Sequence, residues 1–239
     1  GALDNYTNPG GEDIFFAKYD ISGSKKWLKQ WSGNGNAGIK DSAKAISIDS
    51  SGNIYITGYC CGSGNDLFLR KHDANGDEEW KQQLGTPALD EANGLAIDSS
   101  GNIYVGGTTA GRFTGQTNTS APGYRDILLV KYGTNGELFW KRVIDSTQST
   151  SGGDQIYALG VDSSDNVYIT GYTDQRLEGH TSSGAEDYFL IKYNSEGVQQ
   201  WSKQEGTSTA EYGQGLAVDS SDNIYVTGTT YGGLEGANA

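Results

Sequence analysis

The sequence is poor in the residues that mark several common architectures. Its 239 residues include no methionine, three prolines and two histidines. No apolar run approaches the roughly 18 residues that a membrane-spanning helix needs. The N-terminal segment also lacks the basic stretch followed by an apolar one that marks a secretory signal. We therefore expect no membrane insertion, and we expect the chain to be a mature or excised segment.

Cysteine is equally scarce. The only two, Cys60 and Cys61, are adjacent, so no disulfide can join distant parts of the chain. Across a trans peptide their Cα atoms lie about 3.8 Å apart, which is less than the usual minimum of about 4.4 Å for a disulfide. We expect two unpaired thiols in a loop, and a strained, redox-active pair is the alternative. The cysteine content therefore does not identify a compartment.

Basic residues are outnumbered by acidic ones. The chain has 17 Lys and Arg against 30 Asp and Glu, a formal net charge of -13. A surface of this charge repels phosphate backbones, and no local basic stripe offsets it, so the sequence predicts no nucleic-acid partner. Acidic surfaces rich in Thr, Ser, Asn and Gly are common in secreted proteins that meet calcium or sugars, although they also serve solubility alone.

What the chain does contain is repetition. A phrase close to DSSGNIYVTG recurs four times, beginning at Asp49, Asp98, Asp162 and Asp219. A second phrase, close to DxFLxKY, begins at Asp13, Asp66, Asp126 and Asp187. Each of these aspartates is followed after fourteen positions by a tryptophan, namely Trp27, Trp80, Trp140 and Trp201. The period of 53 to 61 residues is too long for ankyrin or tetratricopeptide repeats.

Each repeat predicts four short strands, which we name A to D. Strand A precedes the turn aspartate, strand B is the NIYVTG run, strand C is the DxFLxKY run and strand D carries the tryptophan. Four-stranded units in tandem cannot each bury both faces alone, and radial packing about one axis solves this problem. The sequence therefore predicts an all-β fold, a single β-propeller domain over residues 1–239. Its four blades have C–D hairpins that start near residues 13, 66, 126 and 187.

The order of the strands bears on how the ring closes. The chain starts in the loop before a strand C and ends just after a strand B. We expect two-plus-two closure, in which the first C–D hairpin completes the blade that the last A–B hairpin opens. The alternative is an open part of a larger propeller, with two free sheet edges and a tendency to associate. In either case the repeated Tyr and Trp side chains are expected in the core.

The phrase from Asp219 to Gly228 resembles the hallmark of the bacterial SBBP-type β-propeller repeat family, Asp-x-x-Gly-Asn-x-Tyr-x-Thr-Gly, and the likeness extends over essentially the whole chain. A looser likeness to NHL and PQQ-type propeller repeats supports the strand order and implies no PQQ site. The resemblance implies a bacterial surface or secreted protein that is a platform for binding. The family's name suggests seven blades, whereas this chain holds four repeats.

Alternating strand direction places the D–A and B–C loops on one face of a propeller, which we call the long-loop face, and the tight A–B and C–D turns on the other. Long loops on a rigid scaffold are where we expect a protein or a glycan to bind. The candidate ligand-binding residues on this face are Trp31, Phe113, Tyr124, Tyr172, His180 and Tyr231. Trp31 is the tryptophan that lies outside the repeat register, and His180 is placed in a loop where it can titrate near neutrality.

An acidic residue lies eight positions before each turn aspartate. The four are Asp41, Asp90, Asp154 and Glu211. At the entrance of four inner strands they would offer an axial ring of oxygen ligands, which suits calcium. The alternative, which we favour, is that they cap loops through backbone N–H groups or face water. Calcium is the one cofactor that the sequence brings into consideration.

Catalytic constellations are hard to find. His72 stands where the other repeats have tyrosine, and no nucleophile motif accompanies His180. Glu178, Glu186 and Glu211 are the carboxylates available for glycoside chemistry. The sequence therefore predicts a non-enzymatic extracellular or cell-surface module for protein binding or structural assembly, as part of a larger surface protein or assembly. A lectin-like, glycan-binding propeller is the alternative, and a polysaccharide-active enzyme is the weakest one.

Overall fold

The computed structural model describes residues 12–31, 40–61, 64–114, 124–144 and 153–234. These ranges form sixteen β-strands and contain no α-helix. It follows that the described part of the chain has no helix that is long and apolar enough to cross a membrane. The prediction of an all-β fold is confirmed.

Three of the sheets are complete antiparallel blades whose strands follow the order A to D of the repeat. The first consists of β3 (Ser42–Ile48), β4 (Ile54–Cys60), β5 (Asp66–His72) and β6 (Glu78–Leu84). The second consists of β7 (Asp90–Ile97), β8 (Ile103–Thr109), β9 (Asp126–Tyr132) and β10 (Leu138–Ile144). The third consists of β11 (Gln155–Val161), β12 (Val167–Thr173), β13 (Asp187–Tyr193) and β14 (Gln199–Glu205).

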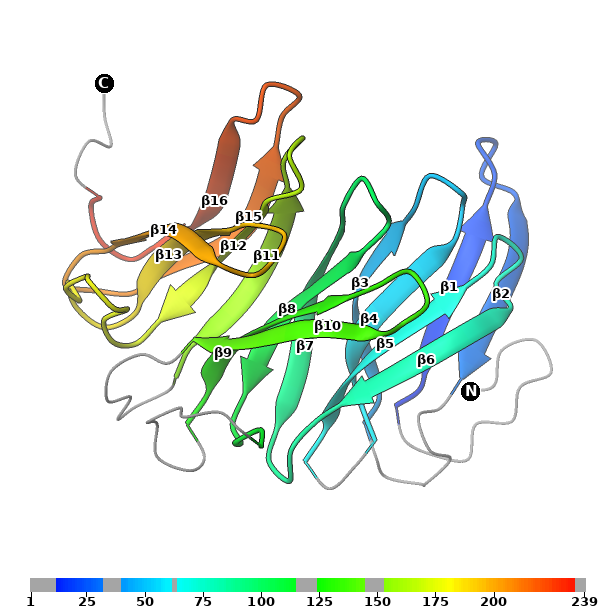
Figure 1. The fold of residues 1–239 in the computed structure, drawn as a ribbon, viewed down its shortest axis with the longest axis horizontal. Coiled ribbons are helices and arrows are strands. Elements are labelled where there is room, and N and C mark those ends of the chain that lie inside the picture. The colour runs from blue at the N-terminus through cyan, green and yellow to red at the C-terminus, as the bar shows by residue number, and fades with distance from the viewer. Residues whose placement is uncertain (1–11, 32–39, 62–63, 115–123, 145–152, 235–239) are drawn as a thin grey trace.

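Two half-blades flank the complete blades. The N-terminal half-blade consists of β1 (Ile14–Tyr19) and β2 (Lys25–Trp31), which are strands C and D of the repeat. The C-terminal half-blade consists of β15 (Glu211–Val218) and β16 (Ile224–Thr230), which are strands A and B. The expected two-plus-two closure is not formed within the described chain, because β1–β2 and β15–β16 remain separate two-stranded sheets at opposite ends of an arc (Figure 1). The arrangement is the open alternative, with two free edges.

The turn aspartates hold the A–B hairpins together. The carboxylate of Asp162 accepts hydrogen bonds from the backbone N–H groups of Ser164 and Asn166 at 3.0 and 2.9 Å, and from the Tyr168 hydroxyl at 2.9 Å. Asp49, Asp98 and Asp219 accept the same two backbone bonds within their own turns. These aspartates are therefore structural caps, and their likeness to the start of a calcium loop is explained by turn geometry.

Every strand A contains a β-bulge that the sequence did not reveal. One residue of strand A has no partner on strand B, and these residues are Lys44, Asn93, Tyr157 and Gln214. Strand B carries a glycine beside each bulge, and a Cβ atom at Gly107 would lie 1.8 Å from the Glu91 carbonyl oxygen. The same close approach, at 1.8 or 1.9 Å, occurs at Gly58, Gly171 and Gly228. The glycine that ends the repeated phrase is thus required by the bulge.

The hydrophobic core lies in the seams between neighbouring blades. One cluster joins β1–β2 to the first blade, a second joins the first blade to the second, and a third joins the second to the third. In the second of these seams Tyr55 and Leu67 contact Ile103, Leu128 and Tyr132 of the next blade, and all five are buried. The predicted core role of the repeated tyrosines is confirmed for Tyr55, Tyr104 and Tyr168, which are at most 2% exposed.

The strand D tryptophans tie each blade to the turn of the next one. The ring of Trp140 lies against Gly197, and its indole N–H donates to the Ser195 carbonyl at 3.1 Å. Trp80 lies in the same way against Gly136 and donates to the Thr134 carbonyl at 3.3 Å. Both glycines have positive φ values, of 74° and 81°. The C–D turn therefore needs glycine both for its backbone conformation and for room beneath the indole.

Replacing Gly107 with alanine tests the requirement imposed by the bulge. We expect Gly107→Ala to lower the free energy of unfolding by about 1–3 kcal/mol, because the new methyl group must displace backbone. The matched control is Gly233→Ala, since a Cβ atom at Gly233 meets nothing within 4 Å. Urea denaturation followed by fluorescence measures both. Equal unfolding midpoints for the two variants would contradict the bulge argument.

Candidate functional site

The four predicted carboxylates lie in equivalent places at the start of the inner strands. Asp41 precedes β3, Asp154 precedes β11, and Asp90 and Glu211 begin β7 and β15. All four are buried, with exposed fractions of 5%, 0%, 0% and 1% respectively. They therefore do not face water, and the structure has to satisfy them internally.

Loop threonines supply much of that satisfaction. Glu211 accepts hydrogen bonds from the backbone N–H and the hydroxyl of Thr207 at 2.6 and 2.8 Å, and from the Thr230 hydroxyl at 2.9 Å. Asp90 accepts the corresponding two bonds from Thr86 at 2.6 and 2.9 Å. In both cases the acid fixes the D–A loop against the start of strand A. This is the capping role that we favoured from the sequence.

The two acids respond differently to their surroundings. Burial acts to raise the pKa of Glu211, but the hydrogen bonds from Thr207, Thr230 and Thr209 outweigh it and leave the pKa below its ordinary value. Burial raises the pKa of Asp90 above its ordinary value, against the hydrogen bonds from Thr109 and Thr86. The two sites therefore differ in charge behaviour although their sequence positions match.

The structure does not gather the four acids into one ligand set. Among the described residues, the one group of three metal-ligating side chains that comes together is Asp41 with Cys60 and Cys61, whose ligand atoms lie within 4.8 Å of one another. The two sulfur atoms of that group form a disulfide, so they are not available as thiolates. Calcium binding by the four acids stays a prediction.

The disulfide itself differs from what we expected. The sequence favoured two unpaired thiols, whereas Cys60 and Cys61 are joined and both are buried. Their surroundings are apolar, since both belong to the cluster with Ile14, Phe16 and Phe68. Backbone geometry permits the ring because Cys61 adopts a positive φ of 52°.

Two of the six ligand-binding candidates are core residues. Phe113 is 7% exposed and packs in the seam between the first and second blades. Trp31 lies at the end of β2, where its ring contacts Phe16, His72 and the Arg70 guanidinium at centroid distances of 5.2, 5.3 and 4.9 Å. Both side chains are therefore engaged in packing between blades, and ligand binding by them stays a prediction. Their aromatic character serves the fold.

His72 belongs to the same packing, as the repeat pattern predicted. It is 3% exposed and its ring lies 4.7 Å from that of Phe16. Burial lowers the pKa of His72 below its ordinary value, although the Glu78 carboxylate opposes this shift. The side chain is therefore a neutral substitute for the tyrosine that Tyr132 and Tyr193 provide in the other blades.

Two further candidates lie apart from each other. The Nε2 atom of His180 lies 2.8 Å from the Ser202 hydroxyl of β14, on the outer strand of the third blade. Tyr124 is half-buried and lies just before β9 of the second blade. Neither contributes to a shared site with the remaining two candidates, Tyr172 and Tyr231.

Tyr172 and Tyr231 belong to one contiguous series of tyrosine side chains. Tyr172 contacts Tyr212 at 5.1 Å between ring centroids, and Tyr212 contacts Tyr231 at 6.4 Å, both edge to face. Tyr157, the bulge residue of β11, extends the series from Tyr172 at 5.7 Å. We call these four residues the tyrosine row. It crosses the seam between the third blade and the C-terminal half-blade at the loop end of the strands, and Tyr231 is 71% exposed.

Burial explains the acid–base state of the row. It raises the pKa of Tyr172 to about 12, and the neighbouring tyrosines add to this effect. Burial also raises the pKa of Tyr212, and the Glu186 carboxylate acts in the same direction. The hydroxyl groups of Tyr172 and Tyr212 are therefore protonated at neutral pH and can donate as well as accept hydrogen bonds.

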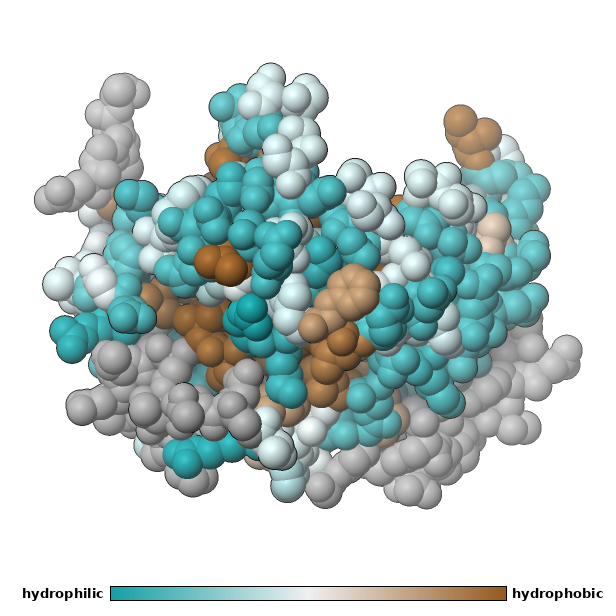
Figure 2. Space-filling view, in the orientation of Figure 1, coloured by the Kyte–Doolittle hydropathy of each residue, from teal (hydrophilic) through white to brown (hydrophobic). Residues whose placement is uncertain are grey.

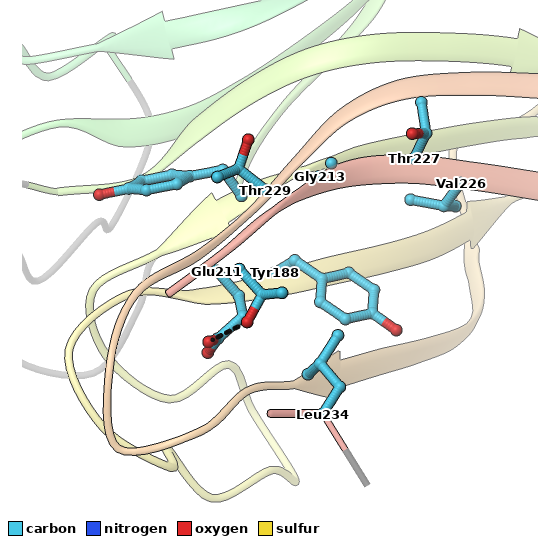
Figure 3. A pocket seen from close by; sticks show the side chains of 10 residues that line it. Tyr188, Glu211, Gly213, Val226, Thr227, Thr229 and Leu234 are labelled. Carbon is cyan, nitrogen blue, oxygen red and sulfur yellow. Dashed lines mark hydrogen bonds between the residues drawn. The ribbon is translucent and has the colours of Figure 1, made fainter. Parts of the chain in front are cut away.

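A hollow of about 160 Å³, open to solvent, lies in the same seam (Figure 3). Tyr188 of β13 and Leu234 flank it, and Val226 and Gly228 of β16 form part of its floor. A second hollow, of about 420 Å³, lies between the second and third blades, and Ile144, Leu177 and Ile191 are among its lining residues. Figure 2 shows another face, which is mainly hydrophilic with apolar side chains gathered near its middle.

The sequence did not identify Tyr157, Tyr188 and Tyr212 as surface aromatics of interest. A signal was present, since Tyr157 and Tyr212 occupy strand A positions where the other repeats carry no tyrosine. Only departures from the repeat, and not the repeat itself, distinguish one seam from another. The aromatic residues that we had selected from the loops were chosen without this comparison.

The repeats themselves match a known family profile. The SBBP beta-propeller repeat profile matches residues 27–67, 79–118, 148–178 and 200–235, which together are more than half of the chain. The chain belongs to the SBBP repeat family. The likeness noted in the sequence is thereby confirmed. Three of the four matches begin in a strand D, in β2, β6 and β14, and continue through strands A and B of the next blade.

Two curated proteins resemble this SBBP chain over about half of its length. An uncharacterized WD repeat-containing protein of Acanthamoeba polyphaga mimivirus is 32% identical over 136 residues, which are 50% of this chain and 9% of that protein. The regulatory protein FlaEY of Caulobacter vibrioides is 27% identical over 123 residues, which are 48% of this chain and 12% of that protein. The matched part is thus about a tenth of each relative.

A solved structure also resembles the SBBP chain in outline. It is a member of the DUF4221 family from Bacteroides vulgatus, with 9% sequence identity and a TM-score of 0.42. The similarity covers 85% of this chain and 64% of that one.

The capping role of Glu211 and Asp90 predicts how the protein responds to chelation. We expect EDTA to leave the melting temperature unchanged, because threonines already bond to Glu211 and Asp90. Differential scanning calorimetry in calcium-free buffer, with and without EDTA, measures this. A lower melting temperature that added calcium restores would show instead that the acids hold an ion.

The burial of His72 predicts a pH dependence of stability. The folded state keeps His72 neutral, whereas the unfolded chain binds a proton below about pH 6.5. Stability should therefore fall as the pH drops from 7.5 to 5, and the fall should be smaller in His72→Tyr, which restores the residue of the other repeats. Urea midpoints at the two pH values measure this difference. An equal fall in stability in the wild type and in His72→Tyr would contradict the attribution of the pH dependence to His72.

Proposed function

We propose that this chain is a non-enzymatic protein-binding module, presented outside the cell, which uses the loop end of its last seam. The single observation that carries the proposal is the tyrosine row. Tyrosine is enriched at binding sites because it offers a large rigid surface together with a hydroxyl group. The row joins three different strands and the segment after β16, so it is held by the scaffold rather than by one flexible loop.

Membership in the SBBP repeat family and the WD-repeat relative support a role in protein interaction. The extracellular location rests on the family likeness and on the acidic, Thr- and Ser-rich composition. For catalysis we find little support, because Glu211 is already enclosed by Thr207 and Thr230. Among the described residues, Glu178 and Glu186 show no pairing that would suit glycoside hydrolysis.

A glycan is the second candidate ligand, and the tyrosine row favours it as well. Sugar rings stack on aromatic side chains, and half-buried tyrosines beside the Glu186 carboxylate can also bond to sugar hydroxyl groups. The two candidates predict different partners for one surface. Distinguishing a protein ligand from a glycan ligand therefore needs both a peptide probe and a glycan probe.

The same protein should be screened against a displayed peptide library and a glycan array. We expect a saturable peptide ligand whose affinity falls at least tenfold in Tyr231→Ala and in Tyr172→Ala, as is usual when an anchoring aromatic is removed. The matched control is Phe139→Ala, which removes a 52% exposed aromatic side chain on β10, away from the row. Titration by isothermal calorimetry gives the affinities.

Saturable glycan binding that the tyrosine variants abolish, without a peptide ligand, would replace protein binding by lectin activity. If Tyr231→Ala and Tyr172→Ala both still bound the ligand, the tyrosine row would not be the binding surface. Turnover of a polysaccharide by the purified chain would overturn the non-enzymatic assignment.

A further inference from the structure

The two half-blades are complementary parts of one blade. The C-terminal half-blade supplies strands A and B, and its outer strand β16 has one free edge. The N-terminal half-blade supplies strands C and D, and its inner strand β1 also has one free edge. In every complete blade these are the two edges that pair, as β4 with β5, β8 with β9, and β12 with β13.

Exposed apolar side chains gather at these two ends. Ten large hydrophobic side chains are exposed in the described part of the chain. Six of them lie on the half-blades, in the turn between β1 and β2, or on β3 next to that half-blade, and these are Phe15, Tyr19, Ile21, Ile46, Ile48 and Tyr225. In the complete blades the side chains in the repeat positions of Phe15, Tyr19 and Tyr225 are buried. Such a concentration marks an interaction surface.

The register of the complete blades extends to the free edges without adjustment. The first residue of strand B pairs with the last residue of strand C, as Ile54 with His72, Ile103 with Tyr132 and Val167 with Tyr193. In the half-blades the corresponding residues are Ile224 and Tyr19. Seven consecutive pairs follow from this register, which places Val226 opposite Ala17 and Gly228 opposite Phe15.

We infer that β1–β2 of a second copy of this chain completes the C-terminal half-blade, with β1 of one copy pairing antiparallel to β16 of the other. The occupant is a second copy because the two half-blades of one chain lie at opposite ends of its arc (Figure 1). Each copy then contributes its β1–β2 hairpin to one shared blade and its β15–β16 hairpin to the other.

Phe15 fits the hollow that the incomplete seam leaves open. Phe68, Leu128 and Phe189, in the same position of strand C, stand opposite Gly58, Gly107 and Gly171 and are at most 2% exposed. Phe15 is 63% exposed in the single chain. Placed opposite Gly228, its ring enters the space that Tyr188 and Val226 line in Figure 3.

Charge is complementary at the same junction. In the second and third blades the strand C lysine lies beside the turn aspartate, with Lys131 3.3 Å from Asp98 and Lys192 3.2 Å from Asp162. The same ammonium groups lie over the strand B tyrosines, 4.8 Å from Tyr104 and 5.0 Å from Tyr168. The corresponding residues of the half-blades are Lys18, Asp219 and Tyr225. The junction brings the lysine of one copy to the aspartate and the tyrosine of the other.

The third blade also offers Trp201 as a contact for the β1–β2 hairpin of the second copy. Trp80 and Trp140 each lie over a glycine of the next C–D turn, and each donates to a carbonyl of that turn. Trp201 occupies the equivalent position in the last complete blade. The matching turn in the partner contains Ile21 and Gly23, and a Cβ atom at Gly23 meets nothing within 4 Å in the single chain. The junction places Trp201 over Gly23, where its indole N–H donates to the Ile21 carbonyl.

Two such junctions close a ring. Three complete blades from each copy and two shared blades make eight, which is within the range that propellers adopt. The contact is head to tail, and a twofold axis relates its two occurrences. Closure pairs the free edges of β1 and β16 at the two ends of the arc (Figure 1).

Mass in solution is the first measurement. We expect the 239-residue chain to sediment at low micromolar concentration with twice its 25.5 kDa mass. Phe15→Glu and Tyr225→Glu each place a charge in the junction and should yield monomers whose far-ultraviolet circular dichroism is unchanged, since both side chains are exposed. The matched control is Phe139→Glu, which charges an exposed aromatic position of β10 and should remain a dimer.

Mixing the two monomeric variants distinguishes pairing between two copies from closure within one chain. The Phe15→Glu chain keeps a normal C-terminal half-blade, and the Tyr225→Glu chain keeps a normal N-terminal one. An equimolar mixture should therefore form a complex of one chain of each kind through a single junction. If each chain closed on itself, the mixture would stay monomeric, and this result would overturn the inference.

A cysteine pair tests the register. Ala17→Cys combined with Val226→Cys should give a covalent dimer on a non-reducing gel, because these positions face each other across the junction. Ala17→Cys combined with Thr227→Cys is the control, since a shift of one residue points the side chains to opposite faces. A disulfide within one chain, equal cross-linking in both variants, or a wild-type chain that is monomeric and open would each overturn the inference.

Discussion

The seam between blades is the contact on which the rest of the molecule depends. No blade buries both of its faces alone, and the strand D tryptophans Trp27, Trp80 and Trp140 each reach across to a glycine in the turn of the following blade. The core is therefore divided into as many clusters as there are complete seams. The same tertiary contact repeats along the chain, and the molecule is stable only where a neighbour is present on each side.

This constraint accounts for the two ends of the arc. Tyr55, Tyr104 and Tyr168 are buried under the following blade, whereas Tyr225 has the same sequence context and is 58% exposed. The difference arises from position along the arc and not from the residue. Each half-blade thus exposes core side chains on the side where no further blade covers them, as Phe15 and Tyr225 show, and this makes it an adhesive surface.

The functional features occur where the repeat is broken. Tyr157 and Tyr212 depart from the strand A pattern, and together with Tyr172 and Tyr231 they form a continuous aromatic row at one seam. Asp90 and Glu211, which follow the pattern, instead fix their loops through threonine hydrogen bonds. In this repeat protein the recurring polar residues maintain the scaffold. The residues that differ from the repeat pattern give one seam a surface that the other seams lack.

The sequence by itself determined the strands, their order within a blade and the structural nature of the turn aspartates, because these depend on local turn chemistry and on a period that recurs four times. It also identified His72 as a replacement for tyrosine. Only the tertiary structure showed that Trp31 and Phe113 are packed in seams, that Cys60 and Cys61 are joined, and that the half-blades stay apart. These outcomes depend on which distant residues become neighbours and on the curvature of the arc, and neither is encoded in the pattern of a single repeat.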